Sequence, residues 1–454
     1  MNNDIFGSGY AVINDIRYKC ELNENGYDKE YLKIYVPRDR SDEIKSNFDI
    51  ECIKVKLLNG MVYTLLYPSV VSSSRGVLSD FVQFVYTAEI LIKNIYQDKK
   101  DNILLEKIDF KVSGILDWGG LNCYEISDGK LGHVEQTSIK IYKTRDFEIN
   151  YYLLCSSLSP LMFMPNVKEE INLKQIPNFS IKFSKAQNID SFFDIIYKLK
   201  KLIILCKLEN INIKEIHSYL EDEENAYNYY PIEIFLRNKH INEKKNSFFG
   251  YKFIGLNQLI DNDSIKKFFS IYDKIEPIIN LYIEILYSKD ISLEQLFLNV
   301  VQALETYHSR FVCDNIKEFV IKVDSIVEEV AEFNKESLRK FLLPNSNRKY
   351  ILLESRIADL VYYSKNIFYF RIQGIHQLDF PSIIATSRNY YTHYNESLLK
   401  TGKVLQGDAL LKQTYKLLEI LDHYILLELG FKDEENIKKI TRGRWGIESE
   451  RFLI

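Results

Sequence analysis

The sequence contains few cysteines, and none of them form a pair at metal-binding spacing. Its six cysteines are scattered without a Cys-x-x-Cys motif, which argues against a zinc ribbon and against a disulfide framework. We expect these thiols to be reduced and buried, as in a cytoplasmic protein. The formal net charge is only −4 at pH 7, so no global basic field attracts nucleic acid, and any affinity for RNA must come from a local patch.

Segments that direct a chain to or through a membrane are also missing. Residues 1–6 lack the basic start and the apolar run of a signal peptide. The longest apolar run, around residues 202–206, is bracketed by lysines and is far too short to span a bilayer. The sequence therefore predicts a cytoplasmic protein without a membrane partner.

Motifs of nucleotide and metal chemistry are absent as well. Residues 114–120 hold neither a Lys-Ser/Thr phosphate loop nor Gly-x-Gly-x-x-Gly, and a β-turn around Trp118 is expected there instead. Residues 261–263 lack the glycine and the distal glutamate of a calcium loop, and Glu305 with His308 has no third ligand at metal-binding spacing. We expect neither a cofactor nor a metal site.

What is present is a long chain rich in apolar residues. With 454 residues, of which 46% are hydrophobic and 13% aromatic, it is expected to form two or three folded domains. Residues 18–183 alternate in short segments between turn residues, which is typical of a β-sandwich or β-barrel. The clearest hairpin lies within residues 53–66 and turns at Asn59-Gly60. Further strands are expected at residues 81–92, 108–115, 137–142 and 171–183.

The apolar period changes to that of a helix over residues 192–208, and a strand is expected at 231–236. Beyond residue 261 apolar stripes at helical spacing, in 293–311 and in 410–429 before Gly430, predict a helical bundle. The predicted fold class is a multidomain α+β protein. It comprises a β-rich, sandwich-like or barrel-like domain at 1–185, a small α+β bridging domain at 186–260, and an all-α bundle at 261–454.

A hexad with the sequence RNYYTH, residues 388–393, carries the most chemistry. On a helix Asn389 and His393 share one face, and Arg388 lies about 140° from His393. RNA contains its own nucleophile, the 2′-hydroxyl, so cleavage needs only proton transfer and charge stabilisation. His393 is the candidate general acid or base, Arg388 the phosphate ligand and Asn389 an orienting group. The alternative is that these are surface residues and that His393 packs among the tyrosines.

The hexad and its flanks resemble the HEPN superfamily of ribonucleases, whose signature is Arg, often followed by Asn, and His a few residues later. The chain as a whole resembles ApeA-type anti-phage proteins. The specific part of this resemblance is Arg388-Asn389-x-x-x-His393-Tyr394, together with the helix bearing residues 302–307. Residues 35–40 and 113–120 are more weakly similar to the β-rich first domain of that family, which the resemblance implies to be a sensor or regulator.

The resemblance implies that residues 261–454 form a HEPN bundle that dimerises, so that two Arg/His motifs face each other in one cleft. A homodimer or higher homo-oligomer supplies the second imidazole that a single chain lacks. The resemblance also implies that Glu305 lines this cleft and holds Arg388 or His393. The alternative for Glu305 is an exposed, charged helix face.

For RNA contact the sequence offers Arg356, Lys365 and Arg371, in a basic stretch interleaved with aromatic residues that can stack on bases. The alternative is that these aromatics belong to a helical core. Together with this resemblance, the sequence predicts a metal-independent HEPN endoribonuclease that acts in abortive infection. Its expected partners are RNA, with tRNA as one candidate, and a phage-derived trigger. A non-catalytic HEPN scaffold that binds nucleotide, RNA or protein is the alternative.

Overall fold

A computed structural model describes residues 6–23, 32–41, 50–76, 79–128, 130–134, 138–155, 173–221, 229–237, 254–287, 291–329, 332–345, 348–363 and 379–445. The chain divides into two compact units. The first comprises Met1–Tyr197 and Ile211–Lys244, and the second comprises Lys198–Asn210 and Lys245–Ile454. The division falls within helix α4 (Ile189–Lys207), between Tyr197 and Lys198.

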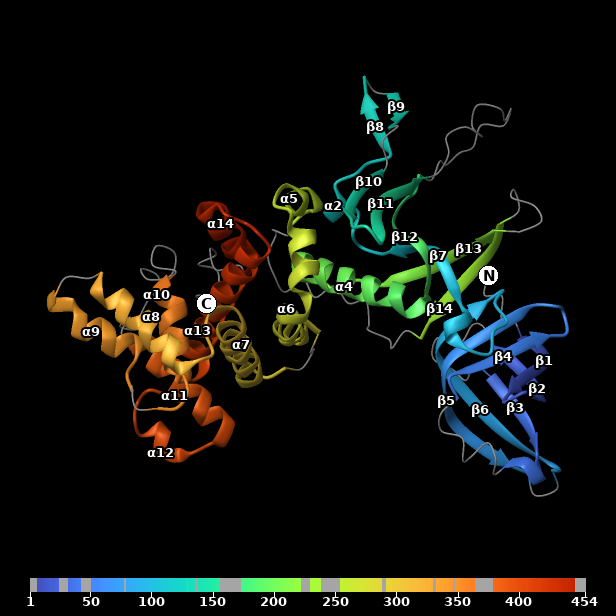
Figure 1. Ribbon diagram of the computed structural model, residues 1–454, viewed down its shortest axis with the longest axis horizontal. Helices are drawn as coiled ribbons and strands as arrows, with labels where there is room; N and C mark the ends of the chain where they lie inside the picture. Colours follow the sequence, from blue (N-terminus) through green and yellow to red (C-terminus); the bar gives the residue numbers. More distant parts are fainter. Residues whose placement is uncertain are drawn as a thin grey trace. The chain divides into compact units, whose positions relative to one another are not determined.

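The first unit is built on an antiparallel sheet of twelve strands in the order β10-β11-β12-β7-β13-β14-β6-β3-β2-β1-β4-β5. Strand β5 also pairs with β6, so the strands β6, β3, β2, β1, β4 and β5 close into a six-stranded barrel, drawn in shades of blue in Figure 1. Closure leaves these strands without a free edge for pairing with another chain. The barrel strands are β1 (Phe6–Ile13), β2 (Ile16–Asn23), β3 (Leu32–Pro37), β4 (Cys52–Leu57), β5 (Val62–Arg75) and β6 (Phe81–Lys93).

The barrel interior follows from the alternation of apolar residues along each strand. In β3, Leu32, Ile34 and Val36 are fully buried while the residues between them are partly exposed, as a period of two requires. At Gly9 of β1 a Cβ atom would collide with the backbone carbonyl of Lys56 on β4. Glycine therefore allows the close approach of β1 and β4 that the barrel needs.

Strand β6 belongs to both the barrel and the rest of the sheet. Its first half pairs with β3 and its last residues, Ile90–Lys93, pair with β14. The remaining elements of the unit are β7 (Leu104–Val112), β10 (Ser138–Lys143), β11 (Phe147–Cys155), β12 (Gln175–Asn188), β13 (Ile213–Glu221), β14 (Tyr229–Leu236), the separate hairpin β8 (Tyr124–Ser127) and β9 (Lys130–His133), and the 3-10 turns Arg38–Arg40 and Lys100–Asn102.

The segment 186–260, which the sequence predicted as a bridging domain, is divided between the two units. Strands β13 and β14 lie between β7 and β6 and so join the two parts of the sheet of the first unit. The second half of α4 belongs to the helical unit. The composition of this segment could not show its division, because strand partners far away in the chain decide it.

The β-turn expected around Trp118 is wrong, because a short helix, α2 (Leu116–Gly119), forms there. Trp118 is buried and its ring meets the edge of Tyr151 on β11 at 6.1 Å between centroids. A Cβ atom at Gly119 would collide with the Tyr151 ring, so a glycine is required for this close packing. Burial of a large aromatic side chain outweighs the weak helix preference of this glycine-rich segment.

The second unit is helical. Its elements in the described ranges are α5 (Leu256–Asp261), α6 (Ser264–Tyr287), α7 (Leu293–Tyr307), the π-helical turn His308–Val312, α8 (Ile316–Glu328), α9 (Glu332–Leu342), α10 (Leu353–Tyr363), α11 (Phe380–His393), α12 (Glu396–Leu399), α13 (Gly407–Glu428) and α14 (Glu434–Trp445). Helix α7 packs against α6, α10, α11 and α13 (Figure 1). A smaller apolar cluster, with Phe319, Val323 and Ala358 among its members, joins α8, α9 and α10.

The predicted fold class is confirmed: a β-rich N-terminal part with a closed barrel precedes a helical C-terminal part. The hairpin turns at Asn59-Gly60 as predicted, and Gly60 adopts a φ of 90°. Helix α13 ends before Gly430, whose φ of 92° is left-handed. None of the described helices combines the length and the apolar character needed to cross a bilayer.

Candidate active site on helix α11

Helix α11 (Phe380–His393) carries the hexad over its last six residues. Pro381 lies in the first turn, where its missing N–H group costs no intrahelical hydrogen bond. Asp379 precedes the helix, but its side chain accepts no capping hydrogen bond. Tyr394 ends the helix in the left-handed conformation, with φ 49° and ψ 39°, and places His393 at the open end.

One face of α11 is fixed by packing. Phe380, Ile384, Ser387 and Tyr391 are buried at the i, i+4, i+7, i+11 positions of a helical stripe. The Tyr391 hydroxyl donates to the carbonyl oxygen of Leu405 at 2.7 Å, and its ring meets that of Phe297 on α7 edge-on. These contacts hold α11 against α7 and determine its rotation.

The hydroxyl group of Ser387 fixes the segment that follows α12. The backbone N–H of Leu405 donates to the Ser387 hydroxyl oxygen at 3.0 Å. That hydroxyl in turn donates to the carbonyl oxygen of Lys403 at 3.4 Å. Because both hydrogen bonds join α11 to this segment, polar contacts set the rotation of α11 together with the apolar packing.

The packing turns the hexad's polar residues outward. Successive residues are about 100° apart on a helix, so Asn389 and His393 occupy the face away from the buried stripe, and Arg388 lies on the flank between that face and the stripe. Asn389 and His393 are exposed and the Arg388 side chain is 37% exposed. Among the described residues no hydrogen bond or ion pair holds the His393 imidazole. The alternative in which His393 is packed among tyrosines is therefore wrong for this structure.

Arg388 is positioned by two neighbours. Its Nη1 donates to Oδ1 of Asn389 at 3.3 Å, and its Nη2 lies 3.5 Å from Oε2 of Glu305 on α7. The predicted pairing of Glu305 with Arg388 is thus present as an ion pair, with both side chains about one third exposed. Whether this pair serves catalysis stays a prediction.

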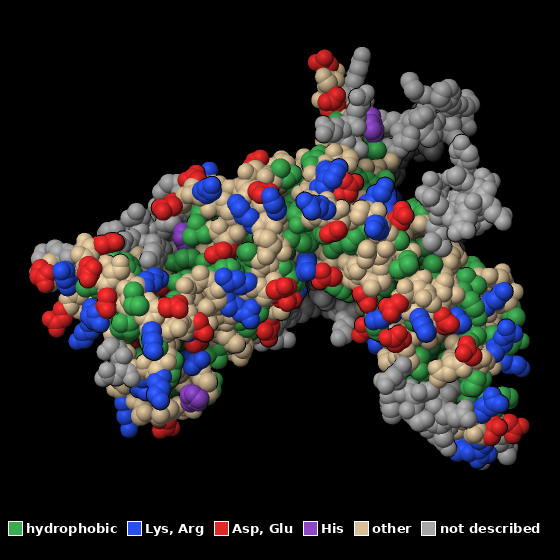
Figure 2. All heavy atoms as spheres, in the orientation of Figure 1, with side chains coloured by type: hydrophobic (Ala, Val, Ile, Leu, Met, Phe, Trp, Pro, Cys, Tyr) green, Lys and Arg blue, Asp and Glu red, His purple; other side chains and the backbone are tan. Residues whose placement is uncertain are grey.

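On the face of the molecule seen in Figure 2, basic and acidic side chains are interspersed without a large field of one sign.

Three residues after Glu305, a buried polar network begins that the sequence did not reveal. His308 opens the π-helical turn and is fully buried. Arg356 donates to its Nδ1 at 3.1 Å, so the imidazole proton resides on Nε2, which donates to Asp359 at 2.9 Å. Burial lowers the pKa of His308, which keeps the ring neutral beside the cation. Lys322 also donates to Asp359, at 2.7 Å.

The residues that the sequence proposed for RNA contact fall into two groups. Arg356 is 7% exposed, and its guanidinium also donates to Asp314 at 2.9 Å and to the carbonyl oxygen of Cys313 at 3.1 Å. These contacts within the protein do not favour a role of Arg356 in binding RNA, because its fork of donors is already engaged. Lys365 and Arg371 lie outside the described residues.

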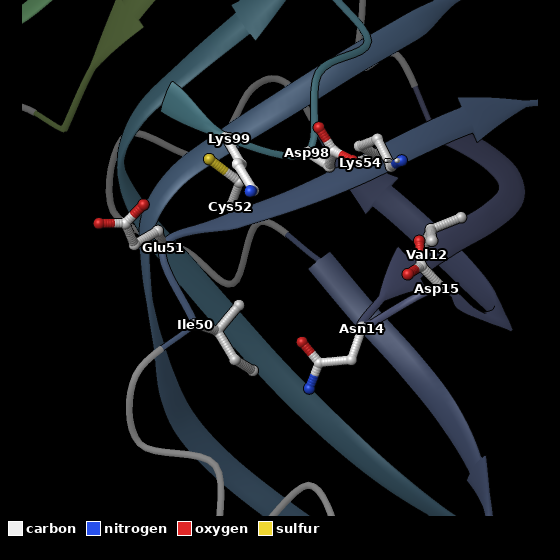
Figure 3. A pocket seen from close by; sticks show the side chains of 9 residues that line it. All are labelled: Val12, Asn14, Asp15, Ile50, Glu51, Cys52, Lys54, Asp98 and Lys99. Carbon is white, nitrogen blue, oxygen red and sulfur yellow. Dashed lines mark ion pairs between the residues drawn. The ribbon is translucent and has the colours of Figure 1, made fainter. Parts of the chain in front are cut away.

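A cavity of about 390 Å³ lies in the first unit, at one end of the barrel (Figure 3). Asn14 and Asp15, at the left-handed turn between β1 and β2, line it together with Cys52 and Lys54 of β4. Nζ of Lys54 lies 3.8 Å from Oδ2 of Asp98, which also lines the cavity. The lining is mixed in charge and carries none of the residues predicted for the active site.

Comparison with known families agrees with this architecture. The Apea-like HEPN family profile matches residues 298–435, a range that includes Glu305 and the whole of the hexad. Residues 298–435 of the helical unit therefore form a HEPN domain, and HEPN domains are generally found in ribonucleases.

The profile of ApeA N-terminal domain 1 matches residues 9–275, which is more than half of the chain. The chain belongs to the ApeA family. At the level of the family, the ApeA-like HEPN domain indicates a nuclease-type role in anti-phage defence. No curated protein and no solved structure matches the chain.

Proposed function

We propose that this protein is a metal-independent endoribonuclease that cleaves RNA as an effector of abortive infection. The observation that carries the proposal is the outward face of α11, where Arg388, ion-paired with Glu305, adjoins the exposed Asn389 and His393. This face lies within the HEPN domain. A fixed cation beside an exposed imidazole is the minimal equipment for phosphodiester cleavage by an internal nucleophile.

In the proposed reaction the 2′-hydroxyl of the substrate attacks the adjacent phosphate. His393 takes the proton from this hydroxyl or gives one to the leaving 5′-oxygen. The planar guanidinium of Arg388 binds the charged oxygens of the phosphorane. The Asn389 amide oxygen accepts from Arg388, which leaves the amide nitrogen to donate to the phosphate or to His393.

A single imidazole serves as base or as acid, whereas efficient cleavage uses both. We therefore infer a homodimer, or a higher homo-oligomer, in which two copies of α11 face each other across one cleft. The exposure of Asn389 and His393 supports this arrangement, since both side chains are accessible to a second subunit.

Control of the nuclease is assigned to the β-rich unit. A ribonuclease that cleaves host RNA must be inactive until infection, so we propose that a phage-derived component is sensed by this unit. The protein would act in the cytoplasm on RNA, with tRNA as one candidate substrate.

The experiment that tests the activity is RNA cleavage in excess EDTA. With infected-cell extract added to supply the trigger, wild-type protein should cut bulk RNA and leave 2′,3′-cyclic phosphate ends, and His393→Ala should lose at least about a hundredfold in rate. His217→Ala, which removes another histidine with a partly exposed side chain, is the matched control and should cleave normally. Cleavage by His393→Ala at the wild-type rate would overturn the proposed role.

The alternative is a HEPN scaffold that binds without cutting. The same cation and amide on α11 could hold a nucleotide phosphate or a backbone phosphate of RNA without any proton transfer. In that case wild type and His393→Ala would both bind labelled RNA, while neither cleaves it in the presence of infected-cell extract.

A further inference from the structure

A cluster of two thiols and an imidazole lies in the β-rich unit, in the neighbourhood of the hairpin β8–β9. His133 ends strand β9, and its Nε2 lies 3.0 Å from Sγ of Cys155, the last residue of β11. The His133 side chain is exposed and Cys155 is half-buried, so the sulfur is accessible to small solutes. Neither residue belongs to the barrel cavity or to the HEPN domain.

Backbone pairing brings the second thiol to the same place. In the ladder between β11 and β12, Cys155 lies directly opposite Gln175. The backbone N–H of Cys123 donates to Oε1 of this same Gln175 at 2.6 Å. Gln175 therefore joins the two cysteines, because it lies opposite Cys155 on β12 and accepts from Cys123 through its side chain.

The hairpin adds a further constraint. Cys123 immediately precedes β8, and its carbonyl oxygen accepts from the backbone N–H of Val134, the residue after His133. Tyr124 and His133 are directly opposed in the β8–β9 ladder. The same short hairpin therefore sets the positions of the imidazole and of the Cys123 thiol with respect to Cys155.

The two sulfurs differ in environment. Burial and a hydrogen bond to Cys155 raise the pKa of the Cys123 thiol to about 12, which keeps it protonated. This hydrogen bond places the two thiols in contact. The His133 Nε2 lies 3.0 Å from the same sulfur, so the imidazole and the Cys123 thiol both contact Cys155.

We propose that Cys155 and Cys123 are a redox-reactive thiol pair that hydroperoxides oxidise to a disulfide, with Cys155 as the attacking sulfur and Cys123 as the resolving thiol. The accessible sulfur next to a buried second thiol is the arrangement of a redox-sensing pair. The other described cysteines lack it: Cys20, Cys52 and Cys206 are buried, and Cys313 donates to the carbonyl oxygen of Asn315.

The reaction balances as two steps. His133 first takes the Cys155 proton, which gives a thiolate and an imidazolium. The thiolate attacks the terminal oxygen of ROOH, the O–O bond breaks, and the departing RO⁻ takes this proton from His133 to give ROH and a sulfenic acid on Cys155. The Cys123 sulfur then attacks this sulfenic acid sulfur, forming the S–S bond and releasing water with the Cys123 proton. The two thiols lose two electrons, and the peroxide gains them.

The test uses the full-length protein, treated with hydrogen peroxide, alkylated and digested for peptide mass spectrometry. We expect a cross-linked peptide pair containing Cys123 and Cys155, lighter by two hydrogen atoms than the reduced pair and separated again by dithiothreitol. In Cys123→Ser the sulfenic acid on Cys155 should accumulate and be captured by dimedone. In Cys155→Ser the Cys123 thiol should remain unoxidised, and Cys313→Ser, the matched control, should form the disulfide as wild type does.

The role of His133 is tested by the rate. Because the imidazole supplies the proton to the leaving oxygen, His133→Gln should slow disulfide formation by about tenfold or more at neutral pH. Circular dichroism confirms that each variant is folded. The proposal is overturned if Cys155 in wild type reacts with peroxide no faster than Cys313, if no Cys123–Cys155 bond forms, or if both thiols are occupied by a stoichiometric metal ion in the purified protein.

Discussion

Arg388 on α11 and Glu305 on α7 form an ion pair, with Nη2 and Oε2 separated by 3.5 Å. The two residues are far apart in the sequence and meet because α7 and α11 pack through Phe297 and Tyr391. Both helices present their polar side chains on the same open side of this contact. The pair therefore links the two helix segments on which the proposed chemistry depends.

The guanidinium geometry of Arg388 can be tested with a substitution that keeps the charge. Arg388→Lys loses the planar fork that binds two phosphate oxygens, so the rate of RNA cleavage should fall by about a hundredfold. The melting temperature should stay near that of wild type because the side chain is partly exposed. Arg145→Lys, at an exposed site in the first unit, is the control. Near-normal cleavage by Arg388→Lys would remove this residue from the phosphate site.

The Glu305 carboxylate is expected to orient Arg388 and not to react. Removing its charge in Glu305→Gln should lower kcat/KM by about fivefold or less, because a partly exposed ion pair contributes at most about 1 kcal/mol. A double-mutant cycle with Arg388→Lys separates this role from a general effect. If the two substitutions act additively on kcat/KM, Glu305 does not work through Arg388.

Assembly is tested with a heterodimer of defined composition. Co-expression of wild type and His393→Ala with two different tags allows the mixed dimer to be isolated. If each cleft needs one imidazole from each chain, this species should be nearly inert, and mixtures containing one quarter wild-type chains should retain about one sixteenth of the activity. A mixed dimer of wild type and His217→Ala should be fully active. Activity that only follows the wild-type fraction contradicts a shared site.

The pH dependence of stability should reflect the buried histidines of the helical unit. Burial lowers the pKa of His423 on α13 to about 4, whereas the unfolded chain binds a proton near pH 6.5. Between these values the unfolded state holds more protons, so the free energy of unfolding falls as the pH is lowered, by about 2 kcal/mol between pH 7 and pH 5. His308 acts in the same direction.

The half-buried Glu354 and the buried Glu419, whose pKa values burial raises, oppose this slope, so the measurement compares variants. Urea unfolding of His423→Gln, followed by circular dichroism, should lose less stability between pH 7 and pH 5 than wild type. His217→Gln, with a partly exposed imidazole, should follow the wild-type curve. Parallel curves for wild type and His423→Gln would show that His423 is not neutral in the folded protein near pH 5.

Much of the fold was accessible from local patterns. The turn at Asn59-Gly60 lies between β4 and β5 as predicted, although β5 is longer than the predicted strand. The strand predicted at 81–92 corresponds to β6, and the helices predicted at 192–208 and 410–429 correspond to α4 and α13, each to within a few residues. Turn chemistry and apolar period act over a few residues and therefore can be read without knowledge of the fold. Strands β1, β8 and β13 were not predicted individually, because their pairing partners and not their own composition stabilise them.

For the site, the sequence by itself determined which groups α11 can present, since the spacing of Arg388, Asn389 and His393 fixes their relative directions on any helix. Only the tertiary structure decided that this face is open and that Glu305 meets Arg388. The same holds for the burial of Arg356 with His308 and for the meeting of Cys123 with Cys155. Such contacts join residues that are distant in the chain, and the packing of helices and the register of strands bring them together, which no local pattern encodes.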